Sequence, residues 1–306
     1  YDPKHALFKL LSLFSVIFGV YWDLISVVIP ALNSASTISR TLSSIFSNEF
    51  SRSLYEVLVI DNGSSDDTVQ IAKRYPVKVH HCPKKGIGPP RNFGIRMAKG
   101  DIVCFTDSDC VVEKDWLEKI TDFFVQNPNA DGVGGPVFPY FRSQNKIQRL
   151  TGELFTEDQG YPKEIKKVEF GSLNGMIFGS NCAYKKKALV LAGFFSEPGG
   201  SNLELSWRLA RMGRNLFFNP SIRACHIFPC SLKGILKQQF RWGSQLTHMK
   251  RVNNLDEENI KGIALISYFL ARRLLSLISL NNLEKRVLHF IQLVSYGLGR
   301  ICGYGQ

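Results

Sequence analysis

Two aspartates at alternate positions, Asp107 and Asp109 with Ser108 between them, are the residues of this sequence best suited to chemistry. They follow residues 101–106, DIVCFT, an apolar run typical of a buried strand. Carboxylates this close repel one another unless a divalent cation joins them, and Mg²⁺ and Mn²⁺ favour such oxygen ligands. We therefore expect Asp107 and Asp109 to hold Mg²⁺ or Mn²⁺ against a diphosphate, whose developing charge the metal would stabilise.

The segments before this triplet predict an α/β fold. Residues 24–30 (LISVVIP) are a continuous apolar run of the kind found in buried parallel strands, residues 55–60 (YEVLVI) predict a second strand, and residues 77–81 predict a third, shorter one. Segments with helical spacing of apolar residues, or with helix-start signals, separate them. This alternation predicts a doubly wound, mostly parallel sheet covered by helices on both faces.

Parallel strands bring the residues that follow them to one edge of the sheet. In doubly wound sheets the ligand crevice lies outside the carboxyl ends of the strands. Residues 30–33, 61–64 and 107–109 each follow a predicted strand, so we expect them to converge on one rim.

In order and spacing, a series of motifs over roughly residues 24–245 resembles family 2 glycosyltransferases of the GT-A fold. The resemblance implies a transferase that takes its sugar from a nucleotide-diphosphate donor. The matching pieces are VVIPALN (27–33), VIDNGSSDDT (59–68), GIGPPRNFGIRMAKGD (86–101), CFTDSDC (104–110), GGPV (134–137), GSNCAYKKKAL (179–189), LELSWRLARMG (203–213) and QQFRWG (238–243).

The resemblance also implies roles for individual residues in the donor site. Arg91 should reach the base or the diphosphate, a task suited to its planar fork. His226 matches a position that supplies a further metal ligand in related enzymes, although a histidine satisfied within the core is the alternative. Asp61-Asn62 stands where the family often has two aspartates, which leaves open which residue reads the base edge. The residues implied to frame the donor are Pro30, Leu32, Asn33, Asp61, Asn62, Arg91, Asp107, Ser108 and Asp109.

The residue expected to activate the acceptor departs from the family pattern. Inverting members usually place an acid at the start of the helix that matches LELSWRL, and here Ser201-Asn202 occupies that position. An asparagine has no titratable carboxylate, and it also serves well as a plain helix cap. Three explanations stay open: Glu197 or Glu204 is the base, the acceptor is itself a phosphate, or the chain is catalytically impaired.

The net charge limits the classes of binding partner, and the cysteine content indicates the redox state of the cellular compartment. The net charge of +12 suits nucleic acid, an anionic membrane surface or phosphorylated small molecules, and no nucleic-acid recognition motif is present. We therefore expect no nucleic-acid partner. The seven cysteines are odd in number and scattered, which indicates a reduced compartment.

Apolar segments at both ends predict contact with a membrane surface. Residues 6–22 are short for a span, and residues 262–280 carry Arg272 and Arg273 at their middle. Helices lying in the interface tolerate such cations, although packing on the catalytic domain is the alternative. Residues 285–303 repeat the apolar spacing. The apolar positions of this last segment are Val287, Ile291, Val294 and Leu298.

These observations predict three segments: an apolar helix at 1–22, a GT-A domain at 23–250, and amphipathic, membrane-associated helices at 251–306. We expect a cytoplasmic enzyme on the inner face of the membrane. It would move a sugar from a UDP- or GDP-sugar to a lipid-phosphate or lipid-linked glycan, by an inverting, non-processive reaction.

Other functions agree with only part of the sequence. The motif Gln238 to Trp242, Q-x-x-R-W, is also typical of processive polysaccharide synthases, but those enzymes carry several clear spans. A dehydrogenase would need G-x-G-x-x-G after residues 24–30, and a nucleotidyltransferase a glycine-rich loop with a lysine; both are missing. A non-catalytic or impaired sugar-nucleotide-binding protein stays as the alternative because of Asn202.

Overall fold

The computed structural model describes residues 24–140, 145–158, 160–170, 177–197, 202–252 and 283–302. The predicted helix at 1–22 and the apolar segment at 262–280 lie outside these residues, as does Ser201.

The central sheet has eight strands in the order β3-β2-β1-β4-β9-β6-β10-β8. Strand β1 pairs in parallel with both β2 and β4, and β2 pairs in parallel with β3, whereas β9 runs antiparallel to β4 and β6. The four strands predicted from the apolar runs are therefore confirmed. The strands are β1 (Ile25–Ala31), β2 (Tyr55–Asp61), β3 (Lys78–His81), β4 (Ile102–Phe105), β6 (Gly132–Gly134), β8 (Lys166–Lys167), β9 (Cys182–Lys185) and β10 (Leu216–Phe218).

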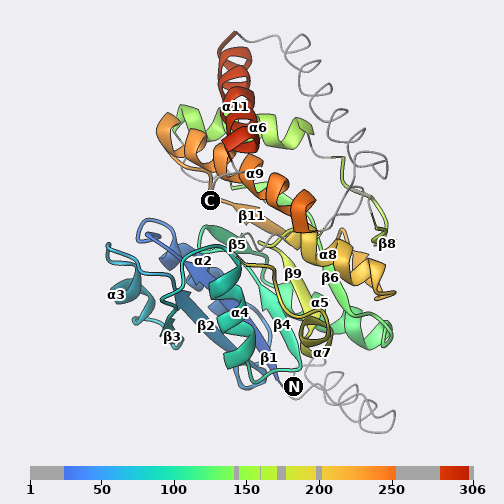
Figure 1. The fold of residues 1–306 in the computed structure, drawn as a ribbon. Coiled ribbons are helices and arrows are strands. Elements are labelled where there is room, and N and C mark those ends of the chain that lie inside the picture. The colour runs from blue at the N-terminus through green and yellow to red at the C-terminus, as the bar shows by residue number, and fades with distance from the viewer. Residues whose placement is uncertain are drawn as a thin grey trace, which may run out of the picture.

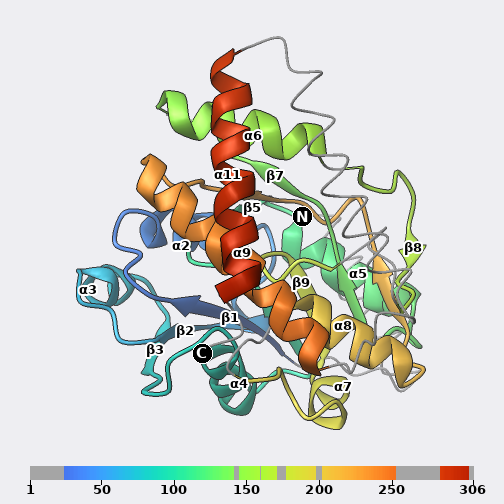
Figure 2. The ribbon, with the colours of Figure 1, turned by 45° about the horizontal axis from the view of Figure 1, so that its top comes forward.

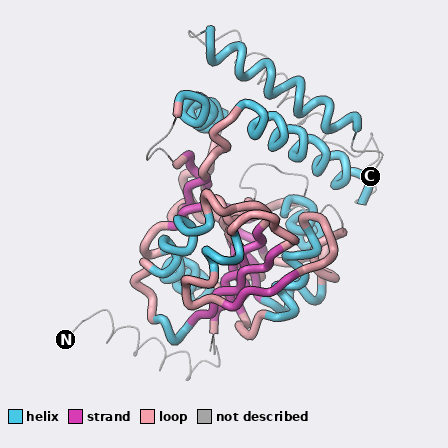
Figure 3. Tube along the Cα trace, turned by 90° about the vertical axis from the view of Figure 1, so that its left-hand side faces the viewer, coloured by secondary structure: helices cyan, strands magenta, loops and turns pink. Residues whose placement is uncertain are grey.

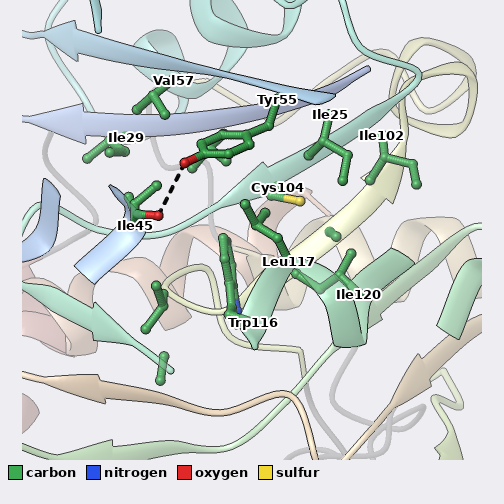
Figure 4. Close-up of a cluster of buried hydrophobic side chains, with 14 of the residues drawn as sticks. Ile25, Ile29, Ile45, Tyr55, Val57, Ile102, Cys104, Trp116, Leu117 and Ile120 are labelled. Atoms are coloured by element: carbon green, nitrogen blue, oxygen red, sulfur yellow. Dashed lines mark hydrogen bonds between the residues drawn. The ribbon is translucent and has the colours of Figure 1, made fainter. Parts of the chain in front are cut away.

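Burial on both faces explains why β1 is almost entirely apolar. Val27 and Ile29 point into one core cluster, and Val28 between them points into a second. Figure 4 shows part of the first cluster, where the Tyr55 hydroxyl donates to the Ile45 carbonyl at 3.5 Å. Since successive side chains of a strand alternate between faces, a strand buried on both sides is mainly apolar, and the buried hydroxyl of Ser26 in β1 donates to Glu56.

Helices cover the two faces of the sheet, as the alternation of strands and helices predicts (Figure 1). The first core cluster takes residues from α2 (Ile38–Phe46), α3 (Thr68–Ala72) and α5 (Trp116–Gln126). The second takes residues from α4 (Gly88–Met97), α7 (Lys186–Leu191) and α8 (Asn202–Arg211). The sheet is thus doubly wound, and a short 3₁₀ turn, η1 (Arg52–Leu54), precedes β2.

A small second sheet begins directly after Asp109. It has the order β5-β11-β7, from β5 (Cys110–Val112), β7 (Val137–Pro139) and β11 (Ala224–His226). Strand β11 is antiparallel to β5, and their register sets His226 opposite Cys110. This pairing carries a residue from late in the chain to the end of β4.

Three helices lie together at one end of the molecule: α6 (Lys146–Asp158), α9 (Leu232–Val252) and α11 (Leu283–Cys302) (Figures 1 and 2). In Figure 3 they stand to one side of the body that holds the sheets. The Ser295 hydroxyl of α11 donates to the Leu236 carbonyl at 2.8 Å, and Leu288 packs with Leu150 and Leu154 of α6. The helix predicted near residues 285–303 is therefore present, and one face of it packs on this chain.

The opposite face of α11 is apolar and exposed. Val287, Phe290, Val294 and Leu298 are between 46% and 57% exposed, whereas the polar His289 and Gln292 are buried. We call these four residues the α11 stripe. Among the described helices none is both long enough and apolar enough to cross a membrane. The division of the chain at residue 250 stays a prediction.

Candidate active site at the carboxyl ends of the strands

Backbone and side-chain hydrogen bonds join the loops that follow β1 and β2. The Asn33 amide N–H donates to Ser64 Oγ at 2.9 Å, and Asn33 Oδ1 accepts from the Ser65 amide at 2.8 Å. Asn33 has φ of 51°, a left-handed conformation that asparagine adopts more easily than most residues. The Asn62 amide also donates to the Ala31 carbonyl at 2.9 Å. The two loops therefore form one continuous edge.

The loop after β4 joins the same edge through two buried serines. Ser34 Oγ and Ser108 Oγ are 2.7 Å apart and share a hydrogen bond. The predicted convergence of residues 30–33, 61–64 and 107–109 is thus confirmed, and we call these three segments the strand-end rim.

Asp61 and Asn62 both hold the turn that follows β2. The Asp61 carboxylate accepts from the amides of Gly63 and Ser64, each at 3.1 Å. Burial raises the pKa of Asp61, but these hydrogen bonds outweigh it and hold the pKa below its usual value. Asn62 Nδ2 donates to the carbonyls of Cys82 and Lys84 at 3.0 and 2.8 Å. Asp61 therefore supplies negative charge at the rim, while the amide of Asn62 is engaged by backbone.

The side chains of Pro30 and Leu32 line the beginning of the rim. Leu32 is 49% exposed and Pro30 is partly exposed, so both offer apolar surface at the end of β1. An exposed apolar side chain beside polar loops suits the flat face of a nucleobase.

Arg91 forms an ion pair with the first aspartate of the triplet. Its Nη2 donates to Asp107 Oδ1 at 2.9 Å, and its side chain is 8% exposed against 34% for Asp107. The guanidinium also lies 5.7 Å from the centre of the Phe195 ring. Arg91 sits in the first turn of α4, which begins with Gly88, Pro89 and Pro90. Prolines are tolerated there because the first amides of a helix have no partner within it.

The second aspartate of the triplet belongs to a group that could hold a metal. Asp109, Cys110 and His226 offer ligand atoms that all lie within 4.8 Å of one another. His226 Nε2 lies 3.5 Å from Asp109 Oδ2, and the Ile227 amide donates to the Asp109 carbonyl at 2.8 Å. The pairing of β11 with β5 thus brings His226 to the rim.

The ionisation of this group leaves Asp109 as an anionic oxygen ligand, whereas His226 has to lose a proton before its imidazole can bind a metal. Burial lowers the pKa of His226, but the Asp109 carboxylate outweighs it and raises the pKa above its usual value. Burial raises the pKa of Asp109, but the positive charges of His226 and Arg241 bring it below its usual value. Burial lifts the pKa of Cys110 well above its usual value, so the residue stays a thiol, a poor ligand for Mg²⁺ or Mn²⁺.

These residues fit a divalent cation in part. The buried Nδ1 of His226 has no hydrogen-bond partner in the structure, and a carboxylate with an imidazole is a donor set that divalent cations accept. Of the three predicted metal ligands, the structure brings Asp109 and His226 together, and it ties Asp107 to Arg91 instead.

Asn202 is the first described residue of α8 and is only 6% exposed. Its Nδ2 donates to Cys182 Sγ at 3.0 Å and to the Tyr184 hydroxyl at 3.3 Å, while its buried Oδ1 has no hydrogen-bond partner. A Cβ atom built on Gly179 would lie 2.8 Å from Asn202 Oδ1 and 3.0 Å from Arg91 Nη2. Asn202 and Arg91 therefore approach each other across a glycine.

The two glutamates predicted as possible bases are both engaged by cations. Glu204 is fully buried, with Arg208 Nε donating to it at 2.7 Å and the Ser196 hydroxyl at 2.9 Å. Glu197 forms an ion pair with Lys84 and accepts from Asn92 Nδ2 at 2.9 Å.

Two residues near the strand-end rim are not among the site residues that the sequence predicts. The positive charge of Arg241 in α9 acts on both Asp109 and His226. The motif Q-x-x-R-W contains this arginine and is the feature of the sequence that could have identified it. Gly179 separates Asn202 from Arg91, and the sequence offers no signal for that contact.

Known proteins resemble this chain both in sequence and in structure. The sequence model of glycosyl transferase family 2 matches residues 26–191. Glycosyltransferase AglE of Haloferax volcanii is 28% identical over 251 residues, which cover 79% of each chain. The poly(ribitol-phosphate) beta-N-acetylglucosaminyltransferase TarS of Staphylococcus aureus is 29% identical over 175 residues, which are 47% of this chain and 30% of TarS.

Solved structures share the fold at low sequence identity. A mannosyltransferase of Pyrobaculum calidifontis, PcManGT, solved with GDP-Man and Mn²⁺, matches with a TM-score of 0.60 and 17% identity, over 98% of this chain and 96% of its own. Residues 1–349 of S. aureus TarS with UDP match with a TM-score of 0.55 and 19% identity, over 91% and 90% of the two chains. The family match spans more than half of the chain and agrees with the strand-end rim and with the shared fold. The chain therefore belongs to glycosyl transferase family 2 and is a sugar-nucleotide-dependent glycosyltransferase of the GT-A fold.

Proposed function

We propose that this enzyme is a metal-dependent, inverting, single-sugar transferase that moves a sugar from a UDP- or GDP-sugar to a membrane-associated acceptor. One observation carries the proposal. The triplet Asp107-Ser108-Asp109 follows β4 and meets the loops after β1 and β2 through the contact of Ser108 with Ser34. Acidic residues, Arg91 and an exposed apolar residue are thereby gathered on one edge, as a nucleotide-diphosphate requires.

In this proposal Asp109 and His226 hold Mg²⁺ or Mn²⁺, with Asp107 available once its contact with Arg91 opens. The bound metal would stabilise the negative charge that the leaving diphosphate acquires. Support comes from the 3.5 Å approach of Asp109 to His226. It also comes from the Mn²⁺ in the complex of PcManGT with GDP-Man.

The remaining residues of the strand-end rim would bind the nucleoside and the diphosphate. Pro30 and Leu32 would contact the base, and Asn33, Asp61 and Asn62 would hold the loops that surround it. Arg91 is the cation placed to reach the diphosphate, because its fork already lies against Asp107.

A membrane-associated acceptor agrees with the α11 stripe. A helix that buries His289 and Gln292 while it exposes Val287 and Phe290 is oriented against the usual preference of a surface helix. In an enzyme with a net charge of +12, such a face suits the surface of an anionic bilayer. We therefore place the enzyme at the inner face of the membrane, where cytoplasmic nucleotide sugars reach it.

The test is release of nucleoside diphosphate from a panel of UDP- and GDP-sugars, each with Mn²⁺, with Mg²⁺ and with EDTA. We expect release that requires the cation and falls at least about 100-fold in Asp109→Asn, which removes the charge of a ligand. Asp101→Asn is the matched control, because Asp101 is an exposed acid at the other end of β4. Unchanged release with EDTA would contradict the metal. Neither binding nor release with any donor would favour a non-catalytic protein.

A further inference from the structure

Among the residues that the structure describes, the neighbourhood of Arg91 offers no free carboxylate to deprotonate an acceptor hydroxyl. Asn202 faces Arg91 across Gly179, and its Oδ1 belongs to a neutral amide with no acid–base function. Its Nδ2 is held by Cys182 and Tyr184, so the amide has a fixed orientation. An acceptor hydroxyl bound beside Arg91 would therefore face the amide oxygen of Asn202, which cannot take up its proton.

The nearby glutamates are unsuited to this task because each already neutralises a cation. Glu204 is fully buried against Arg208, and Glu197 is bound by Lys84 and Asn92. Releasing either carboxylate would leave its partner unpaired, which is costly for the buried pair in particular.

The aspartates of the strand-end rim are engaged as well. Asp61 accepts from the amides of Gly63 and Ser64, Asp107 is paired with Arg91, and Asp109 faces His226. Over the described part of the chain, every acid placed at this edge thus has a structural or ion-pair partner.

Two arginines on helices bring positive charge to the same region. Arg91 of α4 is paired with Asp107, and the charge of Arg241 of α9 acts on Asp109 and His226. A neutral hydroxyl gains little from these cations, whereas an anionic acceptor is attracted by both.

We infer that the acceptor is a phosphate monoester, whose nucleophilic oxygen arrives already ionised. The inference rests on the proposed function, since it concerns the acceptor of the same reaction. One anionic oxygen of the acceptor phosphate attacks the anomeric carbon of the donor sugar. The bond from that carbon to the diphosphate oxygen breaks, and its electron pair leaves with the nucleoside diphosphate. No proton moves, because a phosphate monoester with a second pKa near 6 is largely a dianion at neutral pH.

A matched set of acceptors tests this inference. Binding of the nucleotide sugar with Mn²⁺ is measured first by calorimetry, and its absence would count against the proposed function and not against the acceptor. Transfer is then compared between farnesyl phosphate and farnesol, and between butyl phosphate and butanol. We expect the initial rate of sugar transfer to each phosphate to exceed the rate to the matching alcohol by at least about 100-fold. The ratio of the rates with farnesyl phosphate and with butyl phosphate distinguishes a lipid acceptor from a soluble one. Transfer to a glycan hydroxyl, or to neither phosphate, would overturn the inference.

The pH dependence gives a second readout. Without an enzymic base, kcat/KM should rise with the second ionisation of the acceptor. Replacing the phosphate by a phosphonate, whose second pKa is higher, should move the inflection upward. An inflection that stays in place would indicate a titrating group of the enzyme, contrary to the inference.

Asn202→Asp is the decisive variant. An aspartate there would place a carboxylate beside Arg91 and repel an anionic acceptor, so we expect transfer to farnesyl phosphate to fall at least about tenfold, mainly through KM. Asn129→Asp, at an exposed position, is the control for the added charge. Asn202→Ala, which adds no charge, keeps the test valid if the aspartate fails to fold. Transfer to farnesol by Asn202→Asp, together with no transfer to farnesyl phosphate by the unchanged protein, would indicate an impaired enzyme and would refute the inference.

Discussion

The Nη2 atom of Arg91 lies 2.9 Å from Oδ1 of Asp107, and this ion pair links α4 to the aspartate that follows β4. The arginine side chain is almost completely covered, and the Asp107 carboxylate compensates its buried charge. Its Nε is buried and has no hydrogen-bond partner among the described residues. We therefore regard Arg91 as a cation held in place for the diphosphate.

Replacing Arg91 by lysine should weaken donor binding while leaving the fold intact. A lysine keeps the charge but loses the planar fork, and one charge-assisted hydrogen bond contributes about 1.5 to 3 kcal/mol. We expect the Kd for the nucleotide sugar, measured by calorimetry, to rise about 10- to 100-fold. Arg96→Lys is the control, because Arg96 lies in the same helix and stacks on Phe194 instead. Equal effects of the two substitutions would argue against a specific role for Arg91.

Gly179 should tolerate no side chain, because it separates Asn202 from Arg91. In Gly179→Ala the new methyl would lie 2.8 Å from Asn202 Oδ1 and 3.0 Å from Arg91 Nη2, so both side chains would have to move. We expect a KM for donor or acceptor raised at least about fivefold, with a Tm close to that of the unchanged protein. Gly160→Ala is the control, since nothing lies within 4 Å of a methyl at that position. Normal kinetics in Gly179→Ala would mean that the approach of Asn202 to Arg91 has no bearing on catalysis.

The strands and the strand-end rim were predictable because their signals are local. The segments that became β1 and β2 are mainly apolar because both strands are buried on both faces, and the buried polar side chains of Ser26 and Glu56 hydrogen-bond to each other. Once the strands are parallel, the loops after them must meet, and the contacts of Asn33 with Ser64 and of Ser34 with Ser108 follow from that topology.

Other features depend on contacts between residues far apart in the chain, and local patterns do not encode these. The position of His226 beside Asp109 is set by the register of β11 on β5. The ion pair of Glu204 with Arg208 is local to α8, yet the complete burial of Glu204 follows from how α8 packs. Periodicity predicted an apolar face near residues 285–303 for a membrane surface, but not that the polar His289 and Gln292 of α11 would be buried.

Acid should destabilise the protein partly through Glu56. Burial raises the pKa of Glu56, but hydrogen bonds from Lys78, the Lys99 amide and Ser26 outweigh it and lower the pKa below the usual value. A lowered pKa in the folded state means that the stabilisation is complete above the ordinary glutamate pKa and is lost as pH falls through the folded value. Glu56→Gln should therefore be less stable at pH 7, by about 1 to 3 kcal/mol, and should lose less stability on acidification.

Urea unfolding at a series of pH values between 3 and 7 measures this effect. Glu49→Gln is the matched control, since Glu49 is an exposed glutamate near the same end of the sheet. If the Glu56→Gln curve ran parallel to that of the unchanged protein, the carboxylate would contribute nothing to the acid sensitivity.

The α11 stripe should contribute directly to membrane binding. Val287, Phe290, Val294 and Leu298 lie at helical spacing on the face opposite to α9 and α6, and their exposure means that substitution removes few contacts within the fold. Changing all four to glutamine keeps the helix propensity but removes the apolar surface that would enter the boundary between headgroups and acyl chains. Because burying apolar surface contributes about 25 cal/mol per Å², we expect at least about a tenfold loss of binding to phosphatidylglycerol vesicles.

Sedimentation with vesicles of phosphatidylglycerol or phosphatidylcholine distinguishes the contribution of the apolar stripe to membrane binding from that of the positive charge. Binding through the stripe together with the positive charge should be stronger to the anionic vesicles and should weaken with salt. The matched control changes Val190 and Leu191, two exposed apolar residues of α7, to glutamine, and it should sediment as the unchanged protein does. Circular dichroism and the Tm establish that each variant is folded. If the four-residue variant still sediments fully with anionic vesicles, other segments of the chain hold the enzyme to lipid, and the stripe must be assigned to a different contact.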